Sequence, residues 1–403
     1  MRSAALAVLV AGTLCAVEPV AGRPRDAPPW GFYAHREINR LAIATVPAPL
    51  ARFYKTHAAY VSAHAVDPDK RRYAAPLEGP RHFIDLERFG GGTDRAAADG
   101  RAEGALAGLP RGFADFHRRY TTLTCVRGGA ALEVWHDTER LWVGDEITVL
   151  PQGDYRDWYR ANVLRAFYRE LDTLHVGLPI AGPGCDHLKV TDTMTRHGIL
   201  PYHLTAMQAR LTAAFGRADW TAVRRLSAEI GHYIGDATVP LHTTVNYDGQ
   251  LTGQRGIHAF WESRLPELFA AEAYDGLVGR ARYIDDPTSF YREIVAESHG
   301  LVDTVLAVEA ALRRDYPADA QTCYEERLGR VTPVPCRGFA RAFSDRLGGM
   351  VEARFRRAVA AVGAAWYTAW VDAGQPGVPE TGAVTPAQDT SYARVPGAEG
   401  RGH

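Results

Sequence analysis

The sequence predicts a chain built mainly of helices, because several stretches repeat apolar residues three or four positions apart. One stretch places them at Val223, Leu226, Ile230 and Ile234. Another forms a stripe of Val351, Phe355, Val359, Val362 and Trp366 near the C-terminal end. A shorter one, with Ile38, Leu41 and Ile43, precedes Pro47 and Pro49. Such stripes are typical of helices that pack one face into a core.

The composition is that of an ordinary globular protein. Of the 403 residues, 46% are hydrophobic and 23% are charged. The 46 basic and 47 acidic residues nearly cancel. The chain therefore lacks the net positive charge that favours duplex nucleic acid or an anionic membrane, and we expect no stable nucleic-acid partner.

The N-terminal residues are typical of a secretory signal. Arg2 precedes an apolar run from Ala4 to Val17, which is too short to span a bilayer. We expect residues 1–22 to be removed after Gly22, and residues 23–29 to form a Pro-rich lead. No other run predicts a transmembrane segment, so the sequence indicates a secreted or periplasmic protein.

Four of the five cysteines lie beyond the predicted signal. An even number in an oxidising compartment favours two disulfides, and four cysteines allow three pairings. The preferred pairs are Cys125 with Cys185 and Cys323 with Cys336, and free buried thiols are the alternative.

Residues from about 121 to 187 differ from the helical pattern. The runs "ALEVW" and "EITVLP" are β-like, and "RDWYRANVLRAFYREL" after them is helical in pattern, as is "LPRGFADFHRRYTTLT" before them. We interpret this part as a small appended element held by the Cys125–Cys185 bridge. At the other end, residues 375–403 lack periodicity and are predicted to be a disordered tail.

Five residues that can bind metal ions lie between Gly231 and Glu262. His232 and Asp236 are four positions apart and share one helix face, and His258 and Glu262 repeat that spacing on a second predicted helix. His242 follows Pro240, which ends the first helix. One such pair is usually an ordinary hydrogen-bonded pair, but five residues in this pattern indicate a site. Imidazole and carboxylate ligands without cysteine favour zinc or another divalent ion in an open, catalytic type of site.

These residues, taken with others upstream, carry a family resemblance. Trp30 with His35, the Asp-Pro-Asp stretch 67–69, His82 in "HFID", and then the five residues above occur in the order found in zinc-dependent phospholipases C and single-strand-specific nucleases. The resemblance covers residues 30–374 except the insertion at about 121–187. It implies an all-α, multi-helix bundle with three zinc ions in a cleft, to which this chain adds a small disulfide-linked insertion.

The resemblance also implies which residues bind each zinc. The first ion would be held by Asp69, His82, His232 and Asp236, and the second by His242, His258 and Glu262. The third would be held by His35, the backbone of Trp30, and Asp236 as a bridging carboxylate. Asp69 is preferred because it directly follows the proline, and Asp67 is the second choice. Family members begin at the tryptophan, so either a protease trims the lead or a carbonyl and water replace the amino group.

The activity implied is hydrolysis of phosphodiester bonds, with a zinc-bound hydroxide near Asp236 attacking phosphorus and with Asp69 as the other catalytic carboxylate. Glu262 as the last ligand favours phospholipase C, whereas the Trp30–His35 spacing favours a nuclease. We expect a phospholipase C acting on phospholipid; the alternatives are an endonuclease acting on single-stranded nucleic acid and a non-catalytic zinc-binding protein. Tyr247 and Trp261 are candidate substrate contacts or packing residues. Candidates for orienting the ligands are Asp85, Glu37 and Asp248, and a surface role is the alternative for each.

Overall fold

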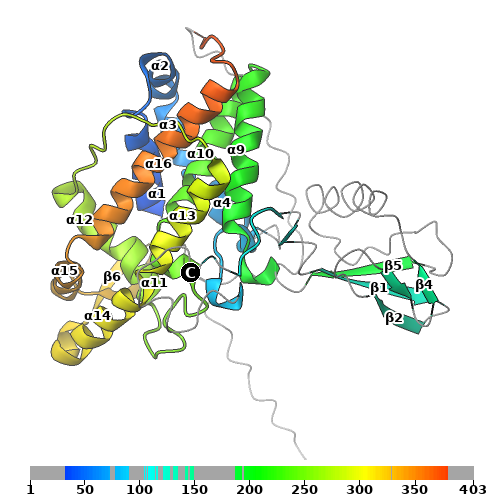
Figure 1. Cartoon of the computed structure of the whole chain (residues 1–403). Helices are drawn as coiled ribbons and strands as arrows, with labels where there is room; N and C mark the ends of the chain where they lie inside the picture. Colours follow the sequence, from blue (N-terminus) through cyan, green and yellow to red (C-terminus); the bar gives the residue numbers. More distant parts are fainter. Residues whose placement is uncertain are drawn as a thin grey trace, which may run out of the picture.

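The computed structural model describes residues 32–72, 78–89, 195–327 and 329–379, and parts of 104–116 and 121–192 (Figure 1). Several predictions lie outside the described residues. These are the signal 1–22, the lead 23–29, Trp30, Cys185, the helical stretch 156–171, and most of the tail, 380–403.

The described residues are mostly helical, as expected for the all-α class. In chain order the helices are α1 (Phe32–Ala42), α2 (Ala48–Thr56), α3 (Ala58–Ala63), α4 (Asp67–Arg71), α9 (Leu200–Gly216), α10 (Trp220–Ala237), α11 (Ile257–Ala259), α12 (Leu265–Ala273), α13 (Pro287–His299), α14 (Val302–Asp315), α15 (Arg337–Arg346) and α16 (Met350–Asp372). Short 3₁₀ turns lie between several of them, and a π-helical turn, η8 (Phe260–Arg264), joins α11 to α12. No helix in the described part of the chain combines the length and apolarity needed to cross a membrane.

The helix α10 lies at the centre of the bundle, in contact with α1, α9 and α16 (Figure 1). The stripes predicted from the sequence form the core between these helices. Val223, Leu226, Ile230 and Ile234 on α10 are buried, and so are Phe355, Val359, Val362 and Trp366 on α16. A second core cluster lies around η8, α14 and α15 and includes Val351. The helix period therefore predicted the buried faces correctly.

Two glycines allow α1 to pack tightly on α10. A Cβ added to Gly231 would lie 1.8 Å from Oδ1 of Asn39, and one added to Gly235 would lie 2.6 Å from Nδ1 of His35. Side chains at these positions would push α1 away. The amide of Asn39 uses the close approach, because its Nδ2 donates to the carbonyl of Ala228 on α10 at 3.0 Å.

The insertion contains strands, as the β-like runs predicted. β1 (Thr121–Arg127) lies between β2 (Ala130–Val134) and β5 (His187–Asp192) in an antiparallel sheet, and β3 (Leu141–Val143) pairs with β4 (Glu146–Thr148). These strands are drawn apart from the helices in Figure 1. The prediction that the preceding helix continues through residue 124 was wrong, since residues 121–124 belong to β1. Threonine and valine are frequent there, and β-branched residues favour strands.

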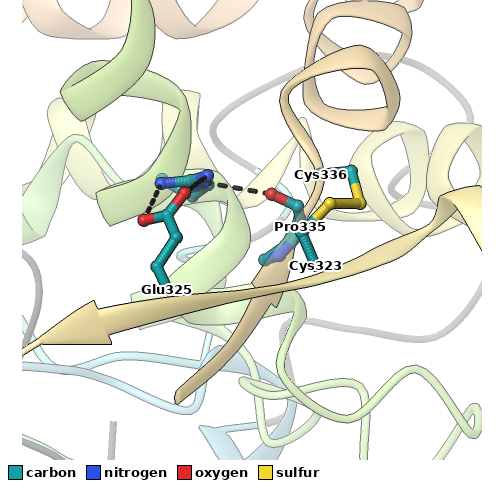
Figure 2. Close-up of a disulfide and its surroundings, with 5 residues drawn as sticks. Cys323, Glu325, Pro335 and Cys336 are labelled. Carbon is teal, nitrogen blue, oxygen red and sulfur yellow. Dashed lines mark hydrogen bonds and ion pairs between the residues drawn. A yellow bond between two sulfur atoms is a disulfide. The ribbon is translucent and has the colours of Figure 1, made fainter. Parts of the chain in front are cut away.

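A second hairpin, β6 (Thr322–Arg327) and β7 (Arg330–Pro335), was not predicted. A disulfide joins Cys323 to Cys336 across its open end, which confirms this pairing (Figure 2). The hairpin is fastened to η8 by Arg264, whose guanidinium group pairs with Glu325 and donates to the carbonyl of Pro335 at 3.1 Å. The partner predicted for Cys125 lies outside the described residues.

Candidate metal centre

The helix α10 places two of the predicted ligands on one face. His232 and Asp236 are four residues apart, and both are buried. The helix begins after Asp219, whose carboxylate accepts from the backbone NH of Ala222 at 3.0 Å. It ends at Ala237, and a 3₁₀ turn at Pro240–Thr243 then carries His242 toward the same side.

The helix α1 adds His35 to these residues. Its Nε2 lies 3.4 Å from Oδ1 of Asp236, and its ring stacks on the ring of His232 at a centroid distance of 4.1 Å. This contact depends on the close packing at Gly235 described above. His35, His232 and Asp236 form the first of three groups that could hold a metal ion. Within each group, the ligand atoms lie within 4.8 Å of one another. The predicted third ligand, Trp30, lies outside the described residues.

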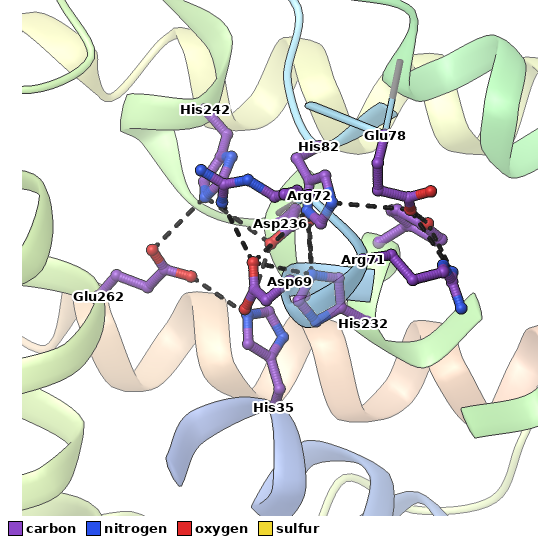
Figure 3. A network of polar contacts seen from close by, with 12 residues as sticks. His35, Asp69, Arg71, Arg72, Glu78, His82, His232, Asp236, His242 and Glu262 are labelled. Carbon is purple, nitrogen blue, oxygen red and sulfur yellow. Dashed lines mark hydrogen bonds and ion pairs between the residues drawn. The ribbon is translucent and has the colours of Figure 1, made fainter. Parts of the chain in front are cut away.

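The second group consists of Asp69, His82 and His232. Asp69 lies on α4, so the Asp-Pro-Asp stretch is a helical turn that directs Asp69 inward, whereas Asp67 pairs with His64 and Lys70. Nε2 of His232 lies 3.7 Å from Oδ1 of Asp69. Nδ1 of His82 lies 2.9 Å from Oδ2 of Asp236. The structure thus brings together all four residues predicted for the first zinc (Figure 3).

The third group is His242, His258 and Glu262, as predicted for the second zinc. Oε2 of Glu262 lies 2.8 Å from Nε2 of His258 and 3.4 Å from Nε2 of His242. Because a carbonyl only accepts, the 3.0 Å contact with the carbonyl of Tyr247 requires Nδ1 of His258 to donate. That bond fixes the tautomer and leaves Nε2 of His258 as the metal-binding atom.

The three groups form one centre because two carboxylates connect them. Oδ1 of Asp236 lies 3.7 Å from Nε2 of His242, and Oε1 of Glu262 lies 3.2 Å from Nε2 of His35 (Figure 3). Burial raises the pKa of Asp236 to about 7, an effect that the neighbouring histidines His242 and His35 oppose. Burial would also raise the pKa of Glu262, but contacts with His242, His258 and His35 lower it well below its usual value.

The donor atoms suit a divalent cation. Nitrogen and carboxylate oxygen are the donors, and no thiolate takes part in the three groups. Nε2 of His232 faces Nδ1 of His82 at 3.0 Å, so at most one of the two nitrogens can donate a proton to the other. A cation between such atoms would accept both lone pairs and offset the carboxylate charge. Each group could therefore hold a metal ion.

Residues that the sequence did not suggest surround His82 on its other side. Glu78 is 1% exposed, and its Oε1 lies 3.8 Å from Nε2 of His82. The same carboxylate pairs with Arg81 at 2.6 Å, pairs with Arg71, and accepts from the hydroxyl of Tyr233. The four-residue spacing of Glu78 and His82 is the sequence feature that could have identified Glu78 as a neighbour of the centre.

The three predicted orienting residues lie elsewhere or act indirectly. The carboxylate of Asp85 contacts Nδ1 of His197 at 3.1 Å, and Glu37 pairs with Arg40 at the surface. Asp248 accepts from the backbone NH of Gly256 at 2.9 Å, which shapes the loop before His258.

The two candidate substrate contacts differ in burial. Trp261 is 3% exposed and packs in the second core cluster, which agrees with the packing alternative. Tyr247 is half-buried, and its ring lies 6.3 Å from that of His258. Substrate stacking remains a prediction for Tyr247.

The described chain is therefore a mainly helical protein with a buried centre that could hold divalent metal ions. Comparisons with models of protein families, with curated proteins and with solved structures found no match to this chain.

Proposed function

We propose that the chain is a zinc-dependent hydrolase of phosphodiester bonds of the phospholipase C type. The observation that carries this proposal is the position of Asp236, which belongs to one metal-binding group and contacts a residue of each of the other two. A carboxylate shared in this way suits a centre with more than one metal ion. Divalent ions held there would activate water and neutralise charge on a phosphodiester, which are the two needs of this reaction.

The side chains of the protein would hold the ions by the sets described above. Asp69, His82, His232 and Asp236 would form one site. His242, His258 and Glu262 would form another, and His35 with Asp236 would contribute to a third. The hydrogen bond to Tyr247 orients the ring of His258 before any ion binds, so this side chain loses less conformational freedom when an ion binds.

Arg72 adds a positive charge beside the centre. Its Nη1 lies 3.2 Å from Oδ1 of Asp69, and its side chain is 10% exposed. A guanidinium group at this place would help to bind an anionic substrate. We expect Arg72 to contact a phosphate oxygen of the substrate rather than a metal ion.

Two substrates are compatible with the sequence features. Glu262 as the last ligand favours phospholipid, and the five-residue spacing of Trp30 and His35 favours single-stranded nucleic acid. The test is a parallel assay of the zinc-loaded protein on phosphatidylcholine micelles and on single-stranded DNA, each with a chelated control. Chelator-sensitive release of phosphocholine supports the phospholipase proposal, and release of nucleotides alone replaces it with the nuclease. Tight zinc binding without cleavage of either substrate would contradict both.

A further inference from the structure

A cavity of about 360 Å³ lies between η8, α14 and the β6–β7 hairpin. Four arginines contribute to its lining, namely Arg255, Arg264, Arg313 and Arg327. The lining also includes Phe260 and Phe339, which pack against each other with ring centroids 5.4 Å apart. The cavity thus combines cationic and aromatic walls.

Carboxylates pair with three of the four arginines of the lining. Arg264 and Arg327 both pair with Glu325, and Arg327 also pairs with Glu267, the acidic residue of the lining. Arg313 pairs with Glu309. Three of the four guanidinium groups are therefore paired with carboxylates.

Arg255 is the fourth arginine of the lining. Its side chain is exposed, and within the described part of the chain its guanidinium group has no hydrogen-bond or ion-pair partner. Carboxylates already hold the other arginines of the cavity in place. Arg255 has no such partner among the described residues, so it is available to a ligand. A guanidinium group binds phosphate oxygens in a bidentate manner.

We infer that this cavity binds a small organic phosphomonoester. The phosphate would pair with Arg255, and the apolar part of the ligand would lie against Phe260 and Phe339. The volume falls within the range of small-molecule sites, which is roughly 300–1,000 Å³. A purely inorganic anion would leave the aromatic wall unused.

The cavity shares a backbone segment with the metal centre. The stretch Ile257–Arg264 carries the candidate ligands His258 and Glu262, while Ala259, Phe260, Ser263 and Arg264 of the same stretch line the cavity. A phosphomonoester is also the class of product that a phospholipase C or a nuclease releases. A role in product feedback rests on the proposed function, whereas binding at the cavity does not.

The experiment is a calorimetric titration of the chelator-treated full-length protein with phenyl phosphate and, separately, with inorganic phosphate. Removing metal eliminates metal-dependent binding of phosphate at the metal centre. We expect phenyl phosphate to bind roughly tenfold more tightly than inorganic phosphate, because only the former buries apolar surface. Equal affinities would overturn the assignment to an organic phosphate.

Substitutions locate the site. We expect Arg255→Glu to weaken phenyl phosphate binding by about tenfold or more, and Arg255→Gln to weaken it less. Arg280→Glu, at an exposed arginine outside the lining, makes the same charge change and should leave binding intact. Circular dichroism checks that each variant is folded. No binding, or binding that Arg255→Glu does not weaken, would overturn the inference, and neither result depends on catalytic activity.

Discussion

Nδ1 of His35 on α1 lies so close to Gly235 on α10 that a methyl group added to this glycine would be 2.6 Å from it. The absence of a side chain at Gly235 is what allows the imidazole to reach Asp236. This contact joins two helices that are distant in sequence and completes one of the three metal-binding groups.

Gly235→Ala should therefore weaken metal binding, although alanine is favoured over glycine in a helix interior by about 1 kcal/mol. The added methyl group forces His35 to rotate or α1 to move. We expect fewer zinc equivalents per chain after dialysis, measured by elemental analysis. Gly216→Ala on α9 is the control, because an added Cβ there meets nothing within 4 Å. Equal zinc content in the two variants would show that the contact is unimportant.

Asp69→Asn and Asp67→Asn test the assignment of the upstream carboxylate. Asp69 contacts His232, whereas Asp67 forms a pair with Lys70 of the kind that contributes at most about 1 kcal/mol. We expect Asp69→Asn to lower zinc affinity and hydrolysis strongly, and Asp67→Asn to change neither. The reverse result in a competition titration with a chromophoric chelator would transfer the role to Asp67.

Glu78→Gln tests whether this carboxylate positions His82. Loss of such an orienting partner typically weakens metal binding by about 10- to 100-fold. The expected changes are a weaker affinity and an altered absorption spectrum of the cobalt-substituted protein, with partial recovery in Glu78→Asp. Glu37→Gln, which removes a carboxylate paired with Arg40 at the surface, is the matched control. An unchanged cobalt spectrum in folded Glu78→Gln would limit Glu78 to a structural role.

His203 provides a pH-dependent prediction away from the ligands. Burial, together with the nearby Arg81, Arg210 and Arg71, lowers the pKa of His203 well below its usual value. Below about pH 6.5 the unfolded chain binds a proton that the folded chain does not, so stability is lost as pH falls, by up to about 1.4 kcal/mol per pH unit. We expect metal-free His203→Leu to lose less unfolding free energy between pH 7 and pH 5 than the metal-free wild type. Identical slopes in urea titrations would contradict this.

The sequence predicted the ligands better than it predicted their surroundings. His232 with Asp236, and His258 with Glu262, could be found because ligands on one helix face must repeat at helical spacing. The close packing of α1 on α10 could not be predicted, because Gly231 and Gly235 do not indicate which helix occupies the space beside them. The β6–β7 hairpin was also missed, since Pro333 and Pro335 interrupt the strand pattern of β7 and only the disulfide suggested a closed loop.

The most direct test of the metal centre is X-ray diffraction from crystals of the zinc-loaded protein on both sides of the zinc absorption edge. We predict anomalous peaks between Asp69, His82 and His232, between His242, His258 and Glu262, and beside His35 and Asp236. Peaks at these places would establish the metal-binding groups on which the proposed hydrolase activity depends. A zinc-loaded crystal without anomalous density at any of the three groups would contradict the account.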